Sequence, residues 1–156
     1  MIFVLVEVAK NIKNVMERKT IIRCRGIILN EEKLLVVKHD KDFDYYAFPG
    51  GHLEWKENPK ECLEREIMEE FGIKPIIGRL LYIHTFVKKE EYFIEFFFEI
   101  TNGKDYLNVK ELNGSHSQEL FDVLWVDKNQ NIKILPEKIY EDFNNGVLLS
   151  DSVKFI

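Results

Sequence analysis

Acidic side chains crowd together at helical spacing in one short stretch of this sequence. Glu66, Glu69 and Glu70 stand at i, i+3 and i+4, so a helix places them on one face. Crowded carboxylates raise one another's pKa unless a positive charge lies between them. A hard divalent cation, Mg²⁺ or Mn²⁺, prefers oxygen ligands and would relieve this repulsion. The spacing therefore indicates a metal site, with a solvated acidic helix face as the alternative.

Two further charged residues belong to the same patch. Arg65 precedes Glu69 by one helical turn, close enough to pair with that carboxylate and hold it in place. Glu57 lies in the loop before the helix and can fold back towards the carboxylates. We therefore expect Arg65 to orient a carboxylate and Glu57 to support the metal site.

The helix that must carry these residues is expected over residues 59–71. Asn58 is a good N-cap, Pro59 suits the first helical position, and Glu61 stands where a capping-box acid reaches back. Gly72 is suited to end the helix. The apolar stripe that packs on a core consists of Leu63, Ile67 and Phe71.

The whole stretch resembles the Nudix box, G-x5-E-x7-R-E-U-x-E-E-x-G-U, in which U is a bulky aliphatic residue. Every constrained position is filled, by Gly51, Glu57, Arg65, Glu66, Ile67, Glu69, Glu70, Gly72 and Ile73. A match at this many fixed offsets is far more specific than a lone glycine-rich triplet. The resemblance implies Mg²⁺- or Mn²⁺-dependent hydrolysis of a nucleoside diphosphate linked to a further moiety, by attack of water on phosphorus.

The resemblance also implies roles for individual residues. Metal ligands would come from the carboxylates and from the carbonyl of the glycine before the box, which gives Gly50, Glu57, Glu66, Glu69 and Glu70. Arg65 and Glu69 would belong to the catalytic machinery, with Arg65 orienting Glu69 or Glu66. Glu66 and Glu70 would bind the metal most directly.

A general base must lie close to the attacking water. In several Nudix enzymes this is a glutamate about six residues before the tryptophan of a late strand, and Glu119 has this position relative to Trp125. His116 competes for the role from the same loop. The remaining histidines, His39, His52 and His84, are isolated in sequence. His52 lies in the variable part of the box and could touch a phosphate, but we favour a surface role for it.

The sequence leaves the substrate open among nucleoside triphosphates, nucleotide sugars such as ADP-ribose, and dinucleoside polyphosphates. Family members that act on ADP-ribose often carry a proline about fifteen residues past the box, where this chain has Val87-Lys88-Lys89. We therefore favour a nucleoside triphosphate or similar small nucleotide. A Nudix-fold module that senses a nucleotide without hydrolysing it is the alternative from another class, although such modules commonly lose box carboxylates and this chain has lost none.

Composition sets the broad class of the protein. The 156 residues are 46% hydrophobic and 31% charged, as in soluble globular proteins, and the net charge of −5 argues against a nucleic-acid-binding surface. No apolar run is long enough to span a membrane. Cys24 and Cys62 lack metal-ligand spacing, so we expect buried, reduced thiols and a cytoplasmic location.

A single domain over residues 1–156 fits the length and the absence of linkers or repeats. Strands are expected at 20–29, 33–38, 76–88, 92–101 and 120–126, with a final helix from Leu135-Pro136 to about 143. Residues 48–51 should be irregular, and Glu95 either faces solvent, which we favour, or points into the site. This pattern predicts an α/β (α+β) sandwich, which matches the mixed sheet between helices of the Nudix fold. Residues 1–19 would form an extra strand or an arm, which could exchange between subunits of a homodimer.

Overall fold

The computed structural model describes residues 3–4, 6–7, 19–109 and 114–156. The N-terminal strand or arm expected over residues 1–19 falls almost wholly outside these ranges and stays a prediction. No helix within them is long and apolar enough to cross a membrane.

The described chain forms a mixed sheet of seven strands, which confirms the predicted α+β class. The strands are β1 (Thr20–Asn30), β2 (Lys33–Lys38), β3 (Gly50–His52), β4 (Ile77–Lys88), β5 (Glu91–Ile100), β6 (Asp122–Asp127) and β7 (Lys154–Phe155). Their order is β6-β2-β1-β5-β4-β7, and β3 pairs with β1. The central pair, β1 and β5, runs parallel, whereas β4 and β5 form an antiparallel hairpin.

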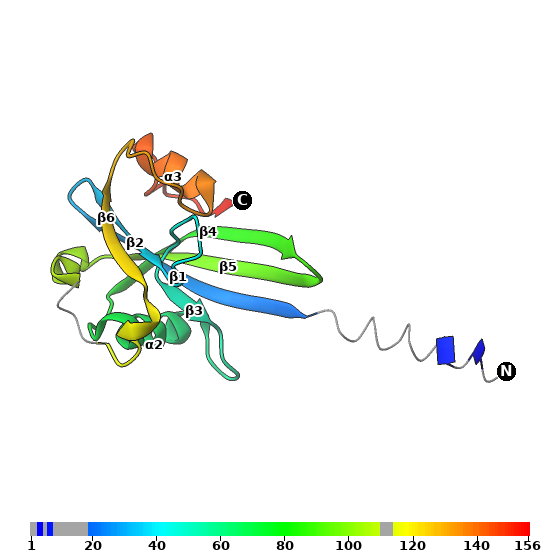
Figure 1. The fold of residues 1–156 in the computed structure, drawn as a ribbon. Helices are drawn as coiled ribbons and strands as arrows, with labels where there is room; N and C mark the ends of the chain where they lie inside the picture. Colours follow the sequence, from blue (N-terminus) through cyan, green and yellow to red (C-terminus); the bar gives the residue numbers. More distant parts are fainter. Residues whose placement is uncertain (1–2, 5, 8–18, 110–113) are drawn as a thin grey trace.

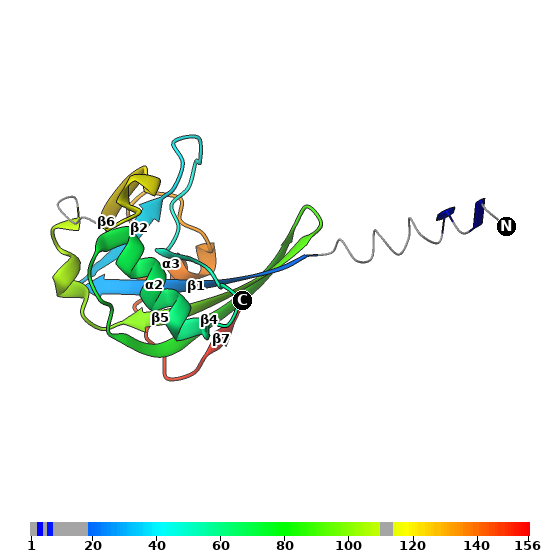
Figure 2. The ribbon, with the colours of Figure 1, turned by 90° about the horizontal axis from the view of Figure 1, so that it is seen from below.

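Helices cover both faces of the sheet. Figure 1 shows α2 (Pro59–Phe71) on one side of the strands and α3 (Glu137–Asn144) on the other, and Figure 2 shows α2 lying across the strands. Each side has its own apolar core. Ile67 and Phe71 of α2 pack with Cys24 and Ile28 of β1, while Ile139 of α3 belongs to the opposite cluster. The predicted sandwich therefore exists as two cores separated by the sheet.

The helix α2 has the ends that its sequence predicts. The Asn58 side chain accepts hydrogen bonds from the backbone N–H groups of Lys60 and Glu61, and the Glu61 carboxylate accepts one from the Asn58 N–H. Gly72 ends the helix in the left-handed conformation at φ 73°. The predicted apolar stripe is buried, so the glutamates of the adjoining face are held next to the sheet.

A divergence between strands makes room for a site. β1 and β2 pair only at their joined ends, through Leu29 with Leu34 and Asn30 with Lys33. Beyond this point β2 pairs along its whole length with β6. The short strand β3, rather than β2, pairs with residues 23–25 of β1. The two halves of the sheet therefore separate beyond the hairpin, and the pocket described below lies between them.

Three local predictions differ from the structure. The glycine pair was expected to be irregular, but Gly50–His52 form the short strand β3, whose residues pair with Arg23, Cys24 and Arg25. The last helix begins at Glu137, with Pro136 as its N-cap rather than inside its first turn. The late strand begins at Asp122, because residues up to Glu119 form a 3-10 turn, η3 (Ser117–Glu119).

Candidate metal and substrate site

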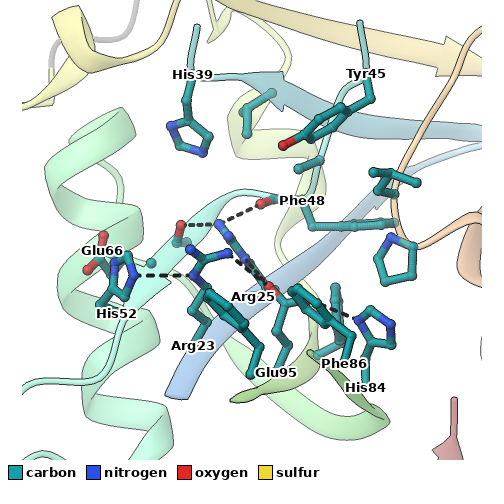
Figure 3. Close-up of a pocket in the computed structure, with 18 of the residues that line it drawn as sticks. Arg23, Arg25, His39, Tyr45, Phe48, His52, Glu66, His84, Phe86 and Glu95 are labelled. Atoms are coloured by element: carbon teal, nitrogen blue, oxygen red, sulfur yellow. Dashed lines mark hydrogen bonds and ion pairs between the residues drawn. The ribbon is translucent and has the colours of Figure 1, made fainter. Parts of the chain in front are cut away.

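A single pocket of about 1070 Å³ brings together residues from both halves of the described sheet. One end carries box carboxylates of α2, namely Glu66, Glu69 and Glu70, together with Glu119. The floor is formed by β1, β4 and β5, and the opposite wall by the loop between β2 and β3 (Figure 3). The glutamates that the sequence predicted on one helical face therefore open onto a cavity rather than onto bulk solvent.

Arg65 gathers three of the predicted acidic residues. Its guanidinium donates to Glu57 at 2.6 Å, to Glu66 at 2.9 Å and to Glu69 at 3.2 Å. The hydrogen bond to Glu57 is the main reason that the pKa of Arg65 is raised and that of Glu57 is lowered. The sequence offered Glu69 or Glu66 as the partner of Arg65. The structure pairs it with both and adds Glu57, which folds back as expected.

Glu70 stands apart from this cluster and is buried. Its Oε2 accepts a hydrogen bond of 2.9 Å from the backbone N–H of Gly50. Burial raises the pKa of Glu70 to about 8, and burial likewise lowers the pKa of His39 to about 4. Burial thus favours the neutral form of both groups, whose His39 Nε2 and Glu70 Oε1 atoms lie 4.0 Å apart.

The glycines of β3 touch two of these carboxylates. A Cβ atom at Gly51 would clash with the Glu66 carboxylate, so a larger residue at the first position of the box would displace that side chain. The carbonyl of Gly50 accepts a short hydrogen bond from Arg25 Nη1, which also donates to the carbonyl of Phe48 at 3.2 Å. The carbonyl expected to bind metal is thus turned towards Arg25.

The donor set fits a hard divalent cation. Within the described ranges no three acidic, histidine or cysteine side chains converge into a ready cage. Glu57, Glu66 and Glu69 each pair with Arg65 instead. Glu66, Glu69 and Glu70 nevertheless place oxygen donors at one end of one pocket, and burial raises the pKa of both Glu66 and Glu70. Carboxylates in such a setting gain the most from a divalent cation, which would stabilise their charged form.

The loop before β6 is fastened to the end of α2. The backbone N–H of His116 donates to the Glu69 carbonyl at 2.7 Å, and His116 Nδ1 lies 3.3 Å from Glu69 Oε2. Glu119 lies in the 3-10 turn that follows and lines the same pocket. Both candidates for the general base therefore reach the carboxylate end, so that geometry alone does not separate them.

The floor of the pocket contains a charged network that the sequence did not predict. Glu95 was expected to face solvent, but it is buried with 6% of its surface exposed, and the expectation is wrong. Its Oε1 lies 3.6 Å from Arg23 and 3.5 Å from Arg25, and its Oε2 lies 3.1 Å from His84 Nδ1. The cause is the parallel register of β1 and β5, which places Arg23 opposite Glu95. Arg23 and Arg25 alternate along one strand and so share a face of the sheet. This alternation was the feature of the sequence that could have indicated a buried charged network.

All four histidines line the pocket, including His52, which is exposed and for which the sequence allows a surface role or a contact with a phosphate. His84 pairs with Glu95 as described, and Arg23 Nε donates to His52 Nε2 at 3.3 Å. The strands and loops that carry these residues meet only in three dimensions, so sequence spacing could not find them. Cys24 and Cys62 are buried free thiols, as predicted.

The sequence matches the model of the NUDIX domain over residues 21–144. It is 36% identical over 90 residues to an 8-oxo-dGTP diphosphatase of Buchnera aphidicola, covering 55% of this chain and 67% of that protein. Over 53 residues it is 40% identical to diphosphoinositol polyphosphate phosphohydrolase 2 of Mus musculus, covering 34% of this chain but only 30% of that protein.

A solved structure shows the same fold. The MutT protein from Methanosarcina mazei Go1 superposes with a TM-score of 0.64 and is 24% identical, covering 83% of this chain and 94% of that chain. At this level of identity the likeness concerns the fold alone. It agrees with the mixed sheet between two helices found here.

Proposed function

The chain belongs to the Nudix family, and on this premise we propose that it hydrolyses a phosphoanhydride bond of a nucleoside diphosphate derivative with Mg²⁺ as cofactor. The observation that carries the proposal is the meeting of Glu66, Glu69, Glu70 and Glu119 at one end of a large pocket. We favour a nucleoside triphosphate as substrate, in the cytoplasm. The name of the Buchnera relative supports this choice, as does the absence of proline from Val87-Lys88-Lys89.

We assign each residue of the site a separate role in metal binding or positioning. Glu66, Glu69 and Glu70 hold the metal at the carboxylate end, with Glu57 in support. Mg²⁺, when bound there, neutralises charge on the phosphates and makes a bound water more acidic. Arg65 fixes the carboxylates of Glu57, Glu66 and Glu69 relative to one another, so that few side-chain rotations remain when the substrate arrives.

Glu119 accepts the proton of the attacking water in this proposal. Glu119 lines the pocket beside the helix that would hold the metal, and a carboxylate within reach of the attacking water is a competent base. His116 is the competing base, and its contact with Glu69 offers it a second role in holding that ligand.

Turnover of a nucleotide panel tests the proposal. The protein is incubated with Mg²⁺ and nucleoside triphosphates, nucleotide sugars or dinucleoside polyphosphates, and the products are separated by chromatography. We expect hydrolysis that EDTA abolishes and Mg²⁺ restores, fastest for a nucleoside triphosphate. Tight binding of one nucleotide with no turnover of any would instead identify a sensor.

A further inference from the structure

Arg25 is a buried cation that has no part in the metal binding or proton transfer proposed above. Only 8% of its surface is exposed, and its Nε lies 3.5 Å from Glu95 Oε1 on the floor of the pocket (Figure 3). Glu95 is also fixed from another side, because His84 Nδ1 lies 3.1 Å from its Oε2. A planar guanidinium group paired with a buried acid has little freedom to turn. The Arg25 side chain is therefore held in one orientation.

Another nitrogen of this guanidinium binds the backbone at the start of β3. Nη1 donates to the carbonyls of both Phe48 and Gly50, the residues on either side of Pro49. Gly50 has φ 117°, a conformation that side chains rarely adopt, and a Cβ atom there would clash with the Cys24 carbonyl. Because glycine can adopt many backbone conformations, a hydrogen bond on each side of this corner narrows its freedom.

Gly50 in turn contacts one of the proposed metal ligands. Its N–H donates to Glu70 Oε2 at 2.9 Å, and Glu70 is buried with 6% of its surface exposed. Arg65 orients two other glutamates of α2, whereas this backbone N–H orients Glu70. The position of the Glu70 carboxylate therefore depends on where the backbone of Gly50 lies.

We propose that Arg25 is a positioning residue for the carboxylate end of the pocket. Anchored by Glu95, it fixes the backbone of Gly50, and Gly50 fixes the Glu70 carboxylate. The part that Glu70 takes in catalysis rests on the proposed function, whereas the chain of contacts from Glu95 to Glu70 can be tested without any turnover. The charged network on the floor of the pocket thus acts on the site beside it.

The fork of the guanidinium suits this task better than a positive charge alone. Arg25 contacts two carbonyls and a carboxylate at once, whereas the ammonium group of a lysine is a point charge on a flexible stem. The charge of Arg25 has a second effect, because it opposes the rise in the pKa of Glu70 that burial causes. A lysine at position 25 keeps the charge and loses the fork, so it separates the two effects.

Hydrogen exchange of single backbone amides tests this chain of contacts. NMR of the isotope-labelled protein gives the exchange rate of the Gly50 N–H and, as an internal reference, that of the Val37 N–H, which donates to the Ala47 carbonyl at 2.9 Å. The variants are Arg25→Met, Arg25→Lys and the double variant Arg25→Met/Glu95→Gln. The double variant removes the acid together with its buried partner, so its folding does not depend on an unpaired buried charge.

Arg23→Met is the matched control. Arg23 approaches the same Glu95 carboxylate at 3.6 Å, but its own Nε donates to His52. We expect Gly50 to exchange about tenfold faster in Arg25→Met, the effect of losing hydrogen bonds from a charged group, and the reference amide to change less than about twofold. Arg25→Lys and the double variant should resemble Arg25→Met, and the control should match wild type.

Three results would overturn the positioning role, namely unchanged Gly50 exchange in Arg25→Met, an equal rise at both amides, or the same rise in the control. Wild-type exchange in Arg25→Lys would also overturn it, because charge rather than the fork would then be sufficient. Exchange in the double variant far beyond that of Arg25→Met would overturn the anchoring by Glu95.

Kinetics with a substrate from the nucleotide panel connect the contacts to catalysis. Arg25→Met should lower kcat about tenfold and change KM less than about twofold, because a displaced Glu70 affects the reacting atoms more than the contacts that hold the substrate. A loss confined to KM would overturn the role in catalysis. Failure of wild type to hydrolyse any phosphoanhydride would overturn the proposed function, while the exchange rates would still decide the chain of contacts.

Discussion

Glu70 differs from Glu66 and Glu69, which pair with Arg65, because it lies outside that cluster. It is buried at the end of α2, its Oε2 accepts from the Gly50 N–H, and burial raises its pKa to about 8. Such a carboxylate is ionised only at a cost, and a bound divalent cation removes that cost. We therefore expect Glu70 to matter more to metal binding than the partly buried Glu66 and Glu69 do.

Glu70→Gln tests this role. Glutamine keeps an oxygen to accept from the Gly50 N–H but supplies no charge, so the fold should persist and Mg²⁺-dependent hydrolysis should fall about a hundredfold or more. Steady-state kinetics and Mg²⁺ titration measure the effect. The control is Glu64→Gln on the same helix, where Glu64 pairs with exposed Lys74 outside the pocket. A rate for Glu70→Gln equal to that of the control would refute the metal assignment.

A second pair of substitutions distinguishes Glu119 from His116 as the general base. Glu119→Gln removes the proposed proton acceptor and should lower kcat by about a hundredfold while leaving KM nearly unchanged. His116→Ala removes only the contact with Glu69 at 3.3 Å and should lower kcat by less than about tenfold. Single-turnover rates measure the chemical step for both variants. A large loss in His116→Ala together with a small one in Glu119→Gln would move the role to His116.

At the scale of elements, the box and its helix were the predictable part. The caps at Asn58 and Gly72 and the buried stripe follow from local residue preferences, and the structure has all of them. The charged network on the floor of the pocket was not predictable, because Glu95 lies opposite Arg23 only through the parallel pairing of β1 with β5. Sequence spacing reports on neighbours within one element, whereas such a pairing joins elements far apart in the chain.

The capping box gives α2 a measurable share of its stability. Asn58 satisfies two backbone N–H groups of the first turn, at 2.9 Å and 3.1 Å. Asn58→Ala should therefore lower the free energy of unfolding by about 1 kcal/mol. Urea denaturation followed by circular dichroism measures this change. Lys60→Ala, an exposed position in the same turn, is the control, and equal midpoints for the two variants would contradict the role of the cap.

At the scale of the whole molecule, Asp142 joins the last helix to the sheet on the face opposite the box. Its carboxylate accepts from Tyr82 of β4 at 2.9 Å and from Lys154 of β7 at 2.6 Å, and it pairs with Lys138 at 2.9 Å. The sequence predicted α3 but not β7 or this junction, since the partners lie far apart along the chain. The junction helps to hold β4, which carries His84 and Phe86 into the pocket.

Acid should weaken this junction only once the pH falls below the ordinary range of an aspartate. Burial tends to raise the pKa of Asp142, but the hydrogen bonds from Lys154, Lys138 and Tyr82 outweigh it and hold the pKa below the ordinary value of 3.8. A carboxyl with a lowered pKa in the folded state contributes stability that is fully present above its unfolded pKa. That contribution is lost as the pH falls through the folded value.

Asp142→Asn removes the titrating group and should make stability less dependent on pH in this range. Wild type should exceed the variant most clearly above about pH 5, and the difference should shrink as the pH falls below 3.8. Urea unfolding at a series of pH values measures both proteins. Asp151→Asn is the matched control, because that carboxylate pairs with Arg79 but is fully exposed. A difference between wild type and Asp142→Asn that stays constant down to about pH 3 would show that Asp142 acts through packing rather than through its charge.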